Sequence, residues 1–338
     1  MKVCNNKFNR DISIDILRGI AILFVIFGHI SRDVYLQSYI WGFHMPIFFF
    51  ISGVLFESSR YKDTYAFVKS KFKSLVLPYI FFYFLTLVYW ILIERHTRGH
   101  NLTICSQFVG LFYGTYSLDY MYFNGALWFL PCLFSMEIIY WFVEKLRYRW
   151  LIFITVLAFN VIGVLLVDVI GGAIWGLNAA MIAICFYAIG HLFRAEIATI
   201  NRKFRKWLIV IVFICIGLQY IFVPYTGKAD LAALDISVPI LYIPTGMIGV
   251  ILYFSLSRII ARNSILEWLG RSSLVLFALQ EPVYRVVIFI GAKIMHLETE
   301  LFRQNMLCCF GATIIVVIVT YPIVICYNRW INPILKML

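Results

Sequence analysis

Long apolar runs recur along the whole chain and constrain its fold more than any other feature. A helix needs about 20 apolar residues to cross a bilayer. The mean hydropathy is +0.88, and only 14% of the 338 residues are charged, so a water-soluble fold of this length could not bury the apolar surface. We therefore predict an all-α polytopic membrane protein, a single integral-membrane domain over residues 1–338, with ten transmembrane helices. The predicted spans are 14–31, 40–56, 75–93, 124–143, 150–168, 172–193, 207–224, 236–256, 272–291 and 306–328.

The net charge of +12 reflects basic residues that lie mainly in the short segments between these spans. Alternate segments hold 22 of the 29 Lys and Arg residues, and the N-terminus belongs to that richer set. Because cytoplasmic segments of membrane proteins carry the excess of basic residues, both termini are predicted to be cytoplasmic. The basic residues are thus interpreted as topology determinants, and no nucleic-acid partner is expected.

The eight cysteines do not form a disulfide or metal-binding pattern. Six of them fall within apolar runs, no CxxC pair occurs, and paired metal-ligand spacing is absent. We interpret them as small buried apolar residues and expect no metal.

The first span carries three ionisable residues, Asp15, Arg18 and His29, among neighbours that are almost all apolar. Such groups are expensive inside a bilayer, so they indicate function. Eleven residues separate Arg18 from His29, which is close to three helical turns and about 16 Å of rise. The two side chains therefore lie on one face, with the arginine near one membrane surface and the imidazole toward the other.

The second span follows after a short link and must pack beside the first. His44 lies in it, near the level of His29, and Pro46 loosens the backbone two residues later. The loop before the third span ends in Lys69, Lys71 and Lys73. This cluster fits either attraction to the membrane surface or contact with the phosphates of a nucleotide-like ligand, and the sequence leaves both open.

Three further positions are candidates for a substrate site. Trp128 opens the fourth span beside Pro131, in the position of an interfacial aromatic residue. Gln280 and Glu281 lie in the ninth span, and Arg285 follows Glu281 by one helical turn. A pair at this spacing can be a structural ion pair or can line a site, and the sequence favours neither.

The chain resembles the acyltransferase-3 family of integral-membrane acyltransferases, and most closely its branch of fucose 4-O-acetylases and related surface-sugar O-acetyltransferases. The residues that carry the resemblance are Asp15-x-x-Arg18-Gly19 followed by His29, then FHMPIFFFISG (43–53), KSLVLPY (73–79), ALWFLPCLF (126–134), AIGHLFR (188–194) and LGRSSLVLFALQEP (269–282). The resemblance implies a bacterial cytoplasmic-membrane enzyme with about ten spans. It also implies that acetyl-CoA, or another acyl-CoA, arrives from the cytoplasm and acylates a sugar hydroxyl.

The resemblance implies that Arg18 lies on the acyl-CoA side and that His29 is catalytic. Two positions depart from the family pattern. Lys71-Phe72-Lys73 stands where many members have Arg-x-Arg, so the planar bidentate fork is lost while the charge is kept. Gln280 stands where many members have a histidine, which argues against an acid or base at that position.

Acyl transfer from a thioester to an alcohol requires a base for the hydroxyl, donors for the oxyanion and close positioning of both substrates. His29 is the predicted general base, and a covalent acyl-histidine is the alternative. His44 is expected either to donate near the thioester oxygen or to be a packed interface histidine.

The other candidate residues are assigned to binding either the acyl donor or the acceptor. Arg18, oriented by Asp15, together with Lys71 and Lys73, is expected to hold acetyl-CoA as the acyl donor. Trp128, Gln280 and Glu281 are expected to contact the glycan or lipid-linked sugar acceptor.

Two other classes of function fit the same pattern. A transporter or flippase for a glycan precursor would also need buried charge and broken helices, although no internal repeat supports it. A structural partner of a glycan synthase would not need Arg18 or His29. The oligomeric state is left open, a homo-oligomer included.

Overall fold

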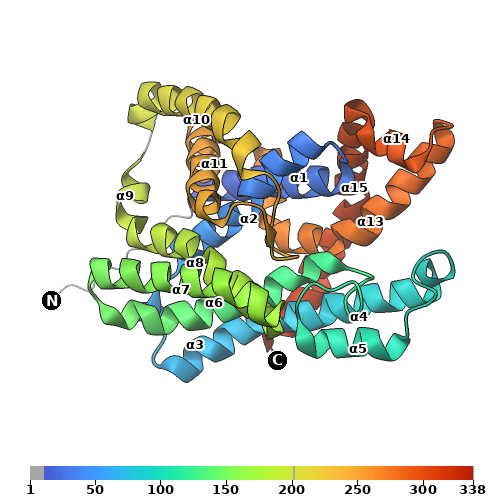
Figure 1. The fold of residues 1–338 in the computed structure, drawn as a ribbon, viewed down its shortest axis with the longest axis horizontal. Helices are drawn as coiled ribbons and strands as arrows, with labels where there is room; N and C mark the ends of the chain where they lie inside the picture. Colours follow the sequence, from blue (N-terminus) through green and yellow to red (C-terminus); the bar gives the residue numbers. More distant parts are fainter. Residues whose placement is uncertain (1–10, 201, 338) are drawn as a thin grey trace.

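The computed structural model describes residues 11–200 and 202–337, and helices make up almost all of its regular structure (Figure 1). The long helices are α1 (Ile12–Ile30), α2 (Val34–Leu55), α4 (Leu77–Leu92), α6 (Phe129–Val143), α7 (Arg149–Ile170), α8 (Leu177–Leu192), α10 (Arg205–Thr226), α11 (Pro239–Ile260), α13 (Ser273–Ile294) and α15 (Met306–Cys326). The shorter α-helices are α3 (Thr64–Lys71), α5 (Ile104–Tyr113), α9 (Arg194–Thr199), α12 (Ser264–Arg271), α14 (Thr299–Gln304) and α16 (Asn332–Met337).

Short 3₁₀ and π segments and one hairpin complete the described structure. The 3₁₀ helices are η1 (Ser58–Arg60), η3 (Glu94–His96), η4 (Gly125–Trp128), η5 (Glu144–Leu146), η6 (Ile174–Gly176) and η7 (Arg202–Phe204). The π segments are η2 (Phe72–Val76) and η8 (Tyr327–Ile331), and the strands are β1 (Ala229–Asp230) and β2 (Asp235–Ile236).

Within residues 11–200 and 202–337, ten helical stretches are long and apolar enough to cross a membrane. The predicted all-α class with ten spans is thus confirmed. Several boundaries were predicted too short. The second span begins at Val34 rather than residue 40, because the Asp33 carboxylate caps it by accepting a hydrogen bond from the Leu36 N–H at 2.7 Å. The third span runs over Thr64–Leu92, and the tenth continues to Met337.

The long connection over residues 94–123 contains the helix α5. The buried Gln107 side chain ties this helix to the loop that follows it. Its amide nitrogen donates to the Asp119 carbonyl at 2.7 Å, and its amide oxygen accepts from the Tyr122 N–H at 3.1 Å. The segment therefore forms a folded wall beside α4.

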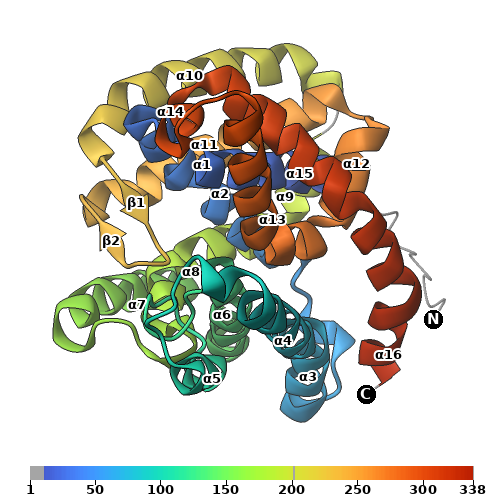
Figure 2. The ribbon, with the colours of Figure 1, turned by 90° about the vertical axis from the view of Figure 1, so that its right-hand side faces the viewer.

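The two helices that carry the predicted histidines lie in the middle of the molecule (Figures 1 and 2). α1 packs against α2, α11, α12 and α13, and α2 packs against α8 and α11. Helices α3 to α8 form one half of the molecule, and α10, α11 and α13 to α15 form the other (Figure 1). Side chains projecting from α1 and α2 thus meet groups from both halves.

α1 and α12 approach each other more closely than side chains would allow. A Cβ at Gly19 would lie 2.1 Å from the carbonyl oxygen of Leu266, and a Cβ at Gly270 would lie 1.9 Å from the carbonyl oxygen of Asp15. Each helix therefore needs glycine where the other's backbone passes. This reciprocal contact fixes both the height and the rotation of α1.

A methyl group at Gly19 should push these two helices apart. Gly19→Ala is expected to lower the melting temperature of the detergent-purified protein, because relieving such overpacking typically costs about 1–3 kcal/mol. Gly217→Ala is the matched control, since a Cβ there meets nothing within 4 Å. A Gly19→Ala protein as stable as the control would contradict the close contact.

Candidate active site

A cavity of about 300 Å³ opens at the C-terminal end of α1 and contains both predicted histidines. We call it the histidine cavity. Its walls come from α1, α2, η4, the β1–β2 hairpin, α13, α14 and the folded segment after α4. Its lining residues are His29, Arg32, Gln37, Trp41, His44, Met45, Arg98, Tyr116, Leu118, Gly125, Ala126, Trp128, Ala229–Ala232, Phe277, Glu281, Tyr284 and Arg303.

The imidazoles of His29 and His44 lie edge to face on adjacent helices, with ring centroids 6.4 Å apart. The His29 ring also lies 6.0 Å from Trp41 and nearly parallel to Tyr284, so aromatic faces surround it. Nδ1 of His44 lies 2.9 Å from the Ile40 carbonyl oxygen. Since a carbonyl only accepts, Nδ1 carries the proton, and Nε2 of a neutral His44 is an acceptor. This contact favours a positioning or accepting role for His44 over donation to an oxyanion.

Glu281 lines the histidine cavity and is also held by the fold. One of its carboxylate oxygens accepts from the Ala126 N–H at 3.0 Å, and the other is paired with Arg285. Arg285 also forms an ion pair with Glu94 at 3.2 Å, and it donates to the Phe123 carbonyl at 2.8 Å. Both readings of the Glu281–Arg285 spacing therefore hold, because the pair is structural and its carboxylate borders the site.

The hairpin between α10 and α11 closes one side of the histidine cavity. It begins at Gly227, whose φ of +60° suits glycine, and pairs Ala229 with Ile236 in antiparallel register. Lys228 extends from it over the Trp41 ring, with its ammonium 5.2 Å from the ring centroid. The hairpin thus covers α2 where His44 and Trp41 project.

A second cavity, of about 310 Å³, lies at the opposite end of α1, and we call it the arginine cavity. Three guanidinium groups line it, those of Arg18, Arg60 and Arg194. Asp11 and Asp15 are its acidic neighbours. The structure pairs Asp15 with Arg271 of α12 at 3.4 Å, a partner that the sequence did not suggest.

A third cavity, also of about 310 Å³, lies between these two, and we call it the connecting cavity. It shares Arg18 with the arginine cavity and Phe277 with the histidine cavity. Phe48, Phe129 and Phe277 line it together, with ring centroids 5.2 to 6.3 Å apart. The three cavities therefore form a series from Arg18 to His29, in which each cavity shares a lining residue with the next.

The two predicted lysines lie outside all three cavities. Nζ of Lys71 forms an ion pair with the buried Glu137 at 2.5 Å. Nζ of Lys73 donates to the carbonyls of Lys336 and Met337 at 3.3 and 3.4 Å. The lysines thus contact other helices here. The arginines near Arg18 are Arg60 and Arg194, which are both paired with Glu57, and Arg271, which is paired with Asp15.

The residues predicted to bind the acceptor also differ in whether they line a cavity. Trp128 and Glu281 line the histidine cavity, whereas Gln280 does not and is completely buried. Neither polar atom of the Gln280 amide has a hydrogen-bond partner among the described residues.

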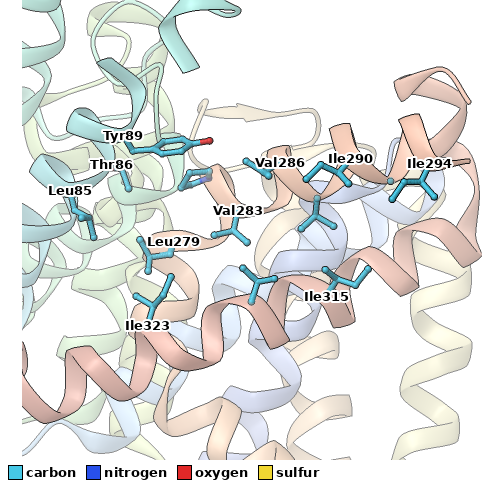
Figure 3. A pocket seen from close by; sticks show the side chains of 14 residues that line it. Leu85, Thr86, Tyr89, Leu279, Val283, Val286, Ile290, Ile294, Ile315 and Ile323 are labelled. Atoms are coloured by element: carbon cyan, nitrogen blue, oxygen red, sulfur yellow. The ribbon is translucent and has the colours of Figure 1, made fainter. Parts of the chain in front are cut away.

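Another cavity, of about 540 Å³, lies on the other face of α13 and has no charged lining residue. Figure 3 shows Val283, Val286 and Ile290 of α13 facing it, with Ile315 and Ile323 of α15 opposite and side chains of α4 at one end. An apolar groove on the outside of a bundle suits hydrocarbon, but it holds no base for proton transfer. The histidine cavity is therefore the better candidate for chemistry.

The fold and its cavities define the class of protein: a polytopic membrane protein with two histidines in an internal cavity and an arginine-lined cavity at the other end of α1. A family model described as an acyltransferase domain, acyltransferase 3, matches residues 11–323. The chain therefore belongs to the acyltransferase-3 family, and it is a membrane acyltransferase. No curated protein and no solved structure matches it.

The Lys71–Glu137 pair gives a test of the lysine's role. Lys71→Met should destabilise the protein by about 3–5 kcal/mol, because it leaves a buried carboxylate without its partner. The double variant Lys71→Met/Glu137→Leu should recover most of the melting temperature and bind acetyl-CoA as wild type does. A stable double variant that has lost acetyl-CoA binding would instead make Lys71 a donor-binding residue.

Proposed function

We propose that this acyltransferase is an O-acetyltransferase of the surface-sugar branch, which transfers the acetyl group of acetyl-CoA to a sugar hydroxyl. The acceptor is a cell-surface glycan or its lipid-linked precursor. The observation that carries the proposal is the series of cavities from Arg18 to His29, because it joins a cationic cavity to a cavity with an imidazole. A donor with phosphates at one end and a thioester at the other matches that polarity.

In this proposal the donor enters at the arginine cavity. The phosphates of CoA contact Arg18, with Arg60 and Arg194 as further cations, and the pantetheine arm extends through the connecting cavity. The thioester then reaches the histidine cavity once the rings of Phe48, Phe129 and Phe277 part. The excess of basic residues in the N-terminal set of segments supports a cytoplasmic position for this end, in a bacterial cytoplasmic membrane.

His29 acts as the general base. Its neutral imidazole takes the proton of the acceptor hydroxyl as the oxygen attacks the thioester carbonyl. The carbon–sulfur bond then breaks, the proton passes from the imidazolium to the departing sulfur, and the acetyl ester and CoA are released.

The acceptor would occupy the half of the histidine cavity beside Trp128 and Glu281. The indole offers a flat apolar face for a sugar ring, and the carboxylate can accept a hydrogen bond from a hydroxyl. The pairing of Glu281 with Arg285 and the Ala126 N–H holds the carboxylate in one orientation. Substrate positioning of this kind lowers the entropic part of the barrier.

Replacing the base should remove turnover without removing the fold. His29→Ala is expected to lower acetyl transfer by about 10²–10⁴, the usual contribution of a general base. His100→Ala is the matched control, because that side chain is exposed and lines none of the three cavities. The readout is release of free CoA in detergent-purified protein with a mixture of glycan acceptors. Normal turnover by a folded His29→Ala protein would contradict the assignment.

Donor binding can be measured without knowing the acceptor. Acetyl-CoA should raise the melting temperature of wild-type protein, by the equivalent of about 2.7 kcal/mol at one hundred times Kd. The shift should disappear in Arg18→Ala and remain in Arg95→Ala, which removes the same charge outside the cavities. Glycan flux in vesicles without acyl consumption, in a protein that acetyl-CoA never stabilises, would support a transporter instead.

A further inference from the structure

The histidine cavity has a cationic side to which the proposed reaction has so far assigned no role. Arg32, Arg98 and Arg303 line it together with His29. The proton transfer uses the imidazole, and the donor phosphates are placed at the opposite end of α1. The contacts of each arginine show which of them can bind a further group.

The carboxylates that line this cavity already have cationic partners. Glu281 is paired with Arg285, and Asp230 lies 3.4 Å from the ammonium of Lys228. Burial opposes protonation of Lys228, but the carboxylates of Asp230 and Asp235 outweigh it and raise the pKa of the lysine. Neither Glu281 nor Asp230 is thus left to neutralise the arginines.

Arg98 is also partly neutralised, since its guanidinium lies 3.6 Å from Glu94 and donates to the Tyr122 hydroxyl at 3.0 Å. Arg32 and Arg303 differ from it. Neither forms an ion pair with a carboxylate within residues 11–200 and 202–337. The net charge of the cavity is therefore concentrated on these two guanidinium groups.

Arg303 is fixed next to the catalytic helix. Its Nε donates to the Ile30 carbonyl and one Nη donates to the His29 carbonyl, both at 2.8 Å. These bonds satisfy the C-terminal end of α1 and leave the second Nη group without a partner among the described residues. Arg32 lies two residues after the end of α1, and its backbone N–H donates to the Arg303 carbonyl at 3.0 Å.

The two arginines are close enough to repel each other. Burial lowers the pKa of Arg303 from its ordinary value, and the charge of Arg32 lowers it further. Both guanidinium groups still stay protonated, since arginine does not lose its proton in proteins. An oxyanion between them would offset the repulsion, and guanidinium groups bind carboxylate and phosphate with paired hydrogen bonds.

We propose that Arg32 and Arg303 bind an oxyanion on the acceptor, so that the enzyme acetylates an acidic or phosphorylated sugar rather than a neutral one. This inference rests on the proposed function and adds the class of acceptor. Because Arg303 is bonded to the backbone of His29, the bound anion and the imidazole keep a fixed separation. The oxyanion thus aligns one hydroxyl of the ring with the base.

The test compares sugars that differ in one group. Glucuronate, glucose 1-phosphate and glucose are titrated separately into detergent-purified protein at constant ionic strength, and the Kd of each is measured by calorimetry. At least one anion should bind about tenfold or more tightly than glucose, as expected for charge-assisted hydrogen bonds. The glucuronate and phosphate arms show whether the oxyanion is a carboxylate on the ring or a phosphate attached to it.

Arg32→Gln and Arg303→Gln should each reduce the preference for the anion at least about fivefold and leave the Kd of glucose unchanged. Arg32 is exposed, and among the described residues its guanidinium forms no ion pair with a carboxylate, so Arg32→Gln should fold. It serves as the test even if Arg303→Gln, which loses the hydrogen bonds to the α1 carbonyls, does not fold. Arg95→Gln, outside the cavities, is the control for loss of charge. The same preference for the anion in wild type, Arg32→Gln and Arg95→Gln would overturn the inference.

Three further outcomes separate this inference from the proposed function. Equal Kd values for all three sugars, in protein that still binds acetyl-CoA, would overturn the anionic acceptor and leave acetyl transfer in place. A fall in acetyl-CoA affinity rather than sugar affinity in Arg32→Gln would assign the arginines to the donor and also overturn it. Retained anion preference without any acetyl-CoA binding would support the anion site while overturning acetyl transfer.

Discussion

The backbone contact between α1 and α12 is the constraint on which the rest of the site depends. Gly19 and Gly270 let two helices meet without side chains between them, so α1 can neither slide nor rotate without a clash. α1 holds Arg18 near one end and His29 near the other. The spacing between Arg18 and His29 is therefore set by one helix, and the position of that helix is set by two glycines.

Most of the buried charge in the described residues is balanced within the fold. Glu137 is paired with Lys71, and Glu281 shares Arg285 with Glu94. A lone carboxylate in a low-dielectric interior is costly, so these pairs allow helices from both halves of the molecule to pack. The same logic explains why a cluster of cations that the fold does not balance is informative, because it leaves positive charge for an anion to bind.

Local patterns predicted much of this structure, and contacts between distant segments account for what they missed. The apolar runs predicted ten spans, and the three-turn spacing placed Arg18 and His29 on one helix. The roles of Lys71 and Lys73 depend on which residues another helix brings opposite them, and no local pattern contains that. Arg303 lies 274 positions from His29 in the sequence. No local pattern therefore predicts that its side chain contacts the end of α1.

The three rings that line the connecting cavity also bear on the membrane as a barrier. Phe48, Phe129 and Phe277 present no hydrogen-bonding atom, so a chain of water molecules has nothing to bridge it across their contact. A continuous chain of water across the membrane would let protons leak down their gradient. Contact between three apolar rings is a barrier to such a leak.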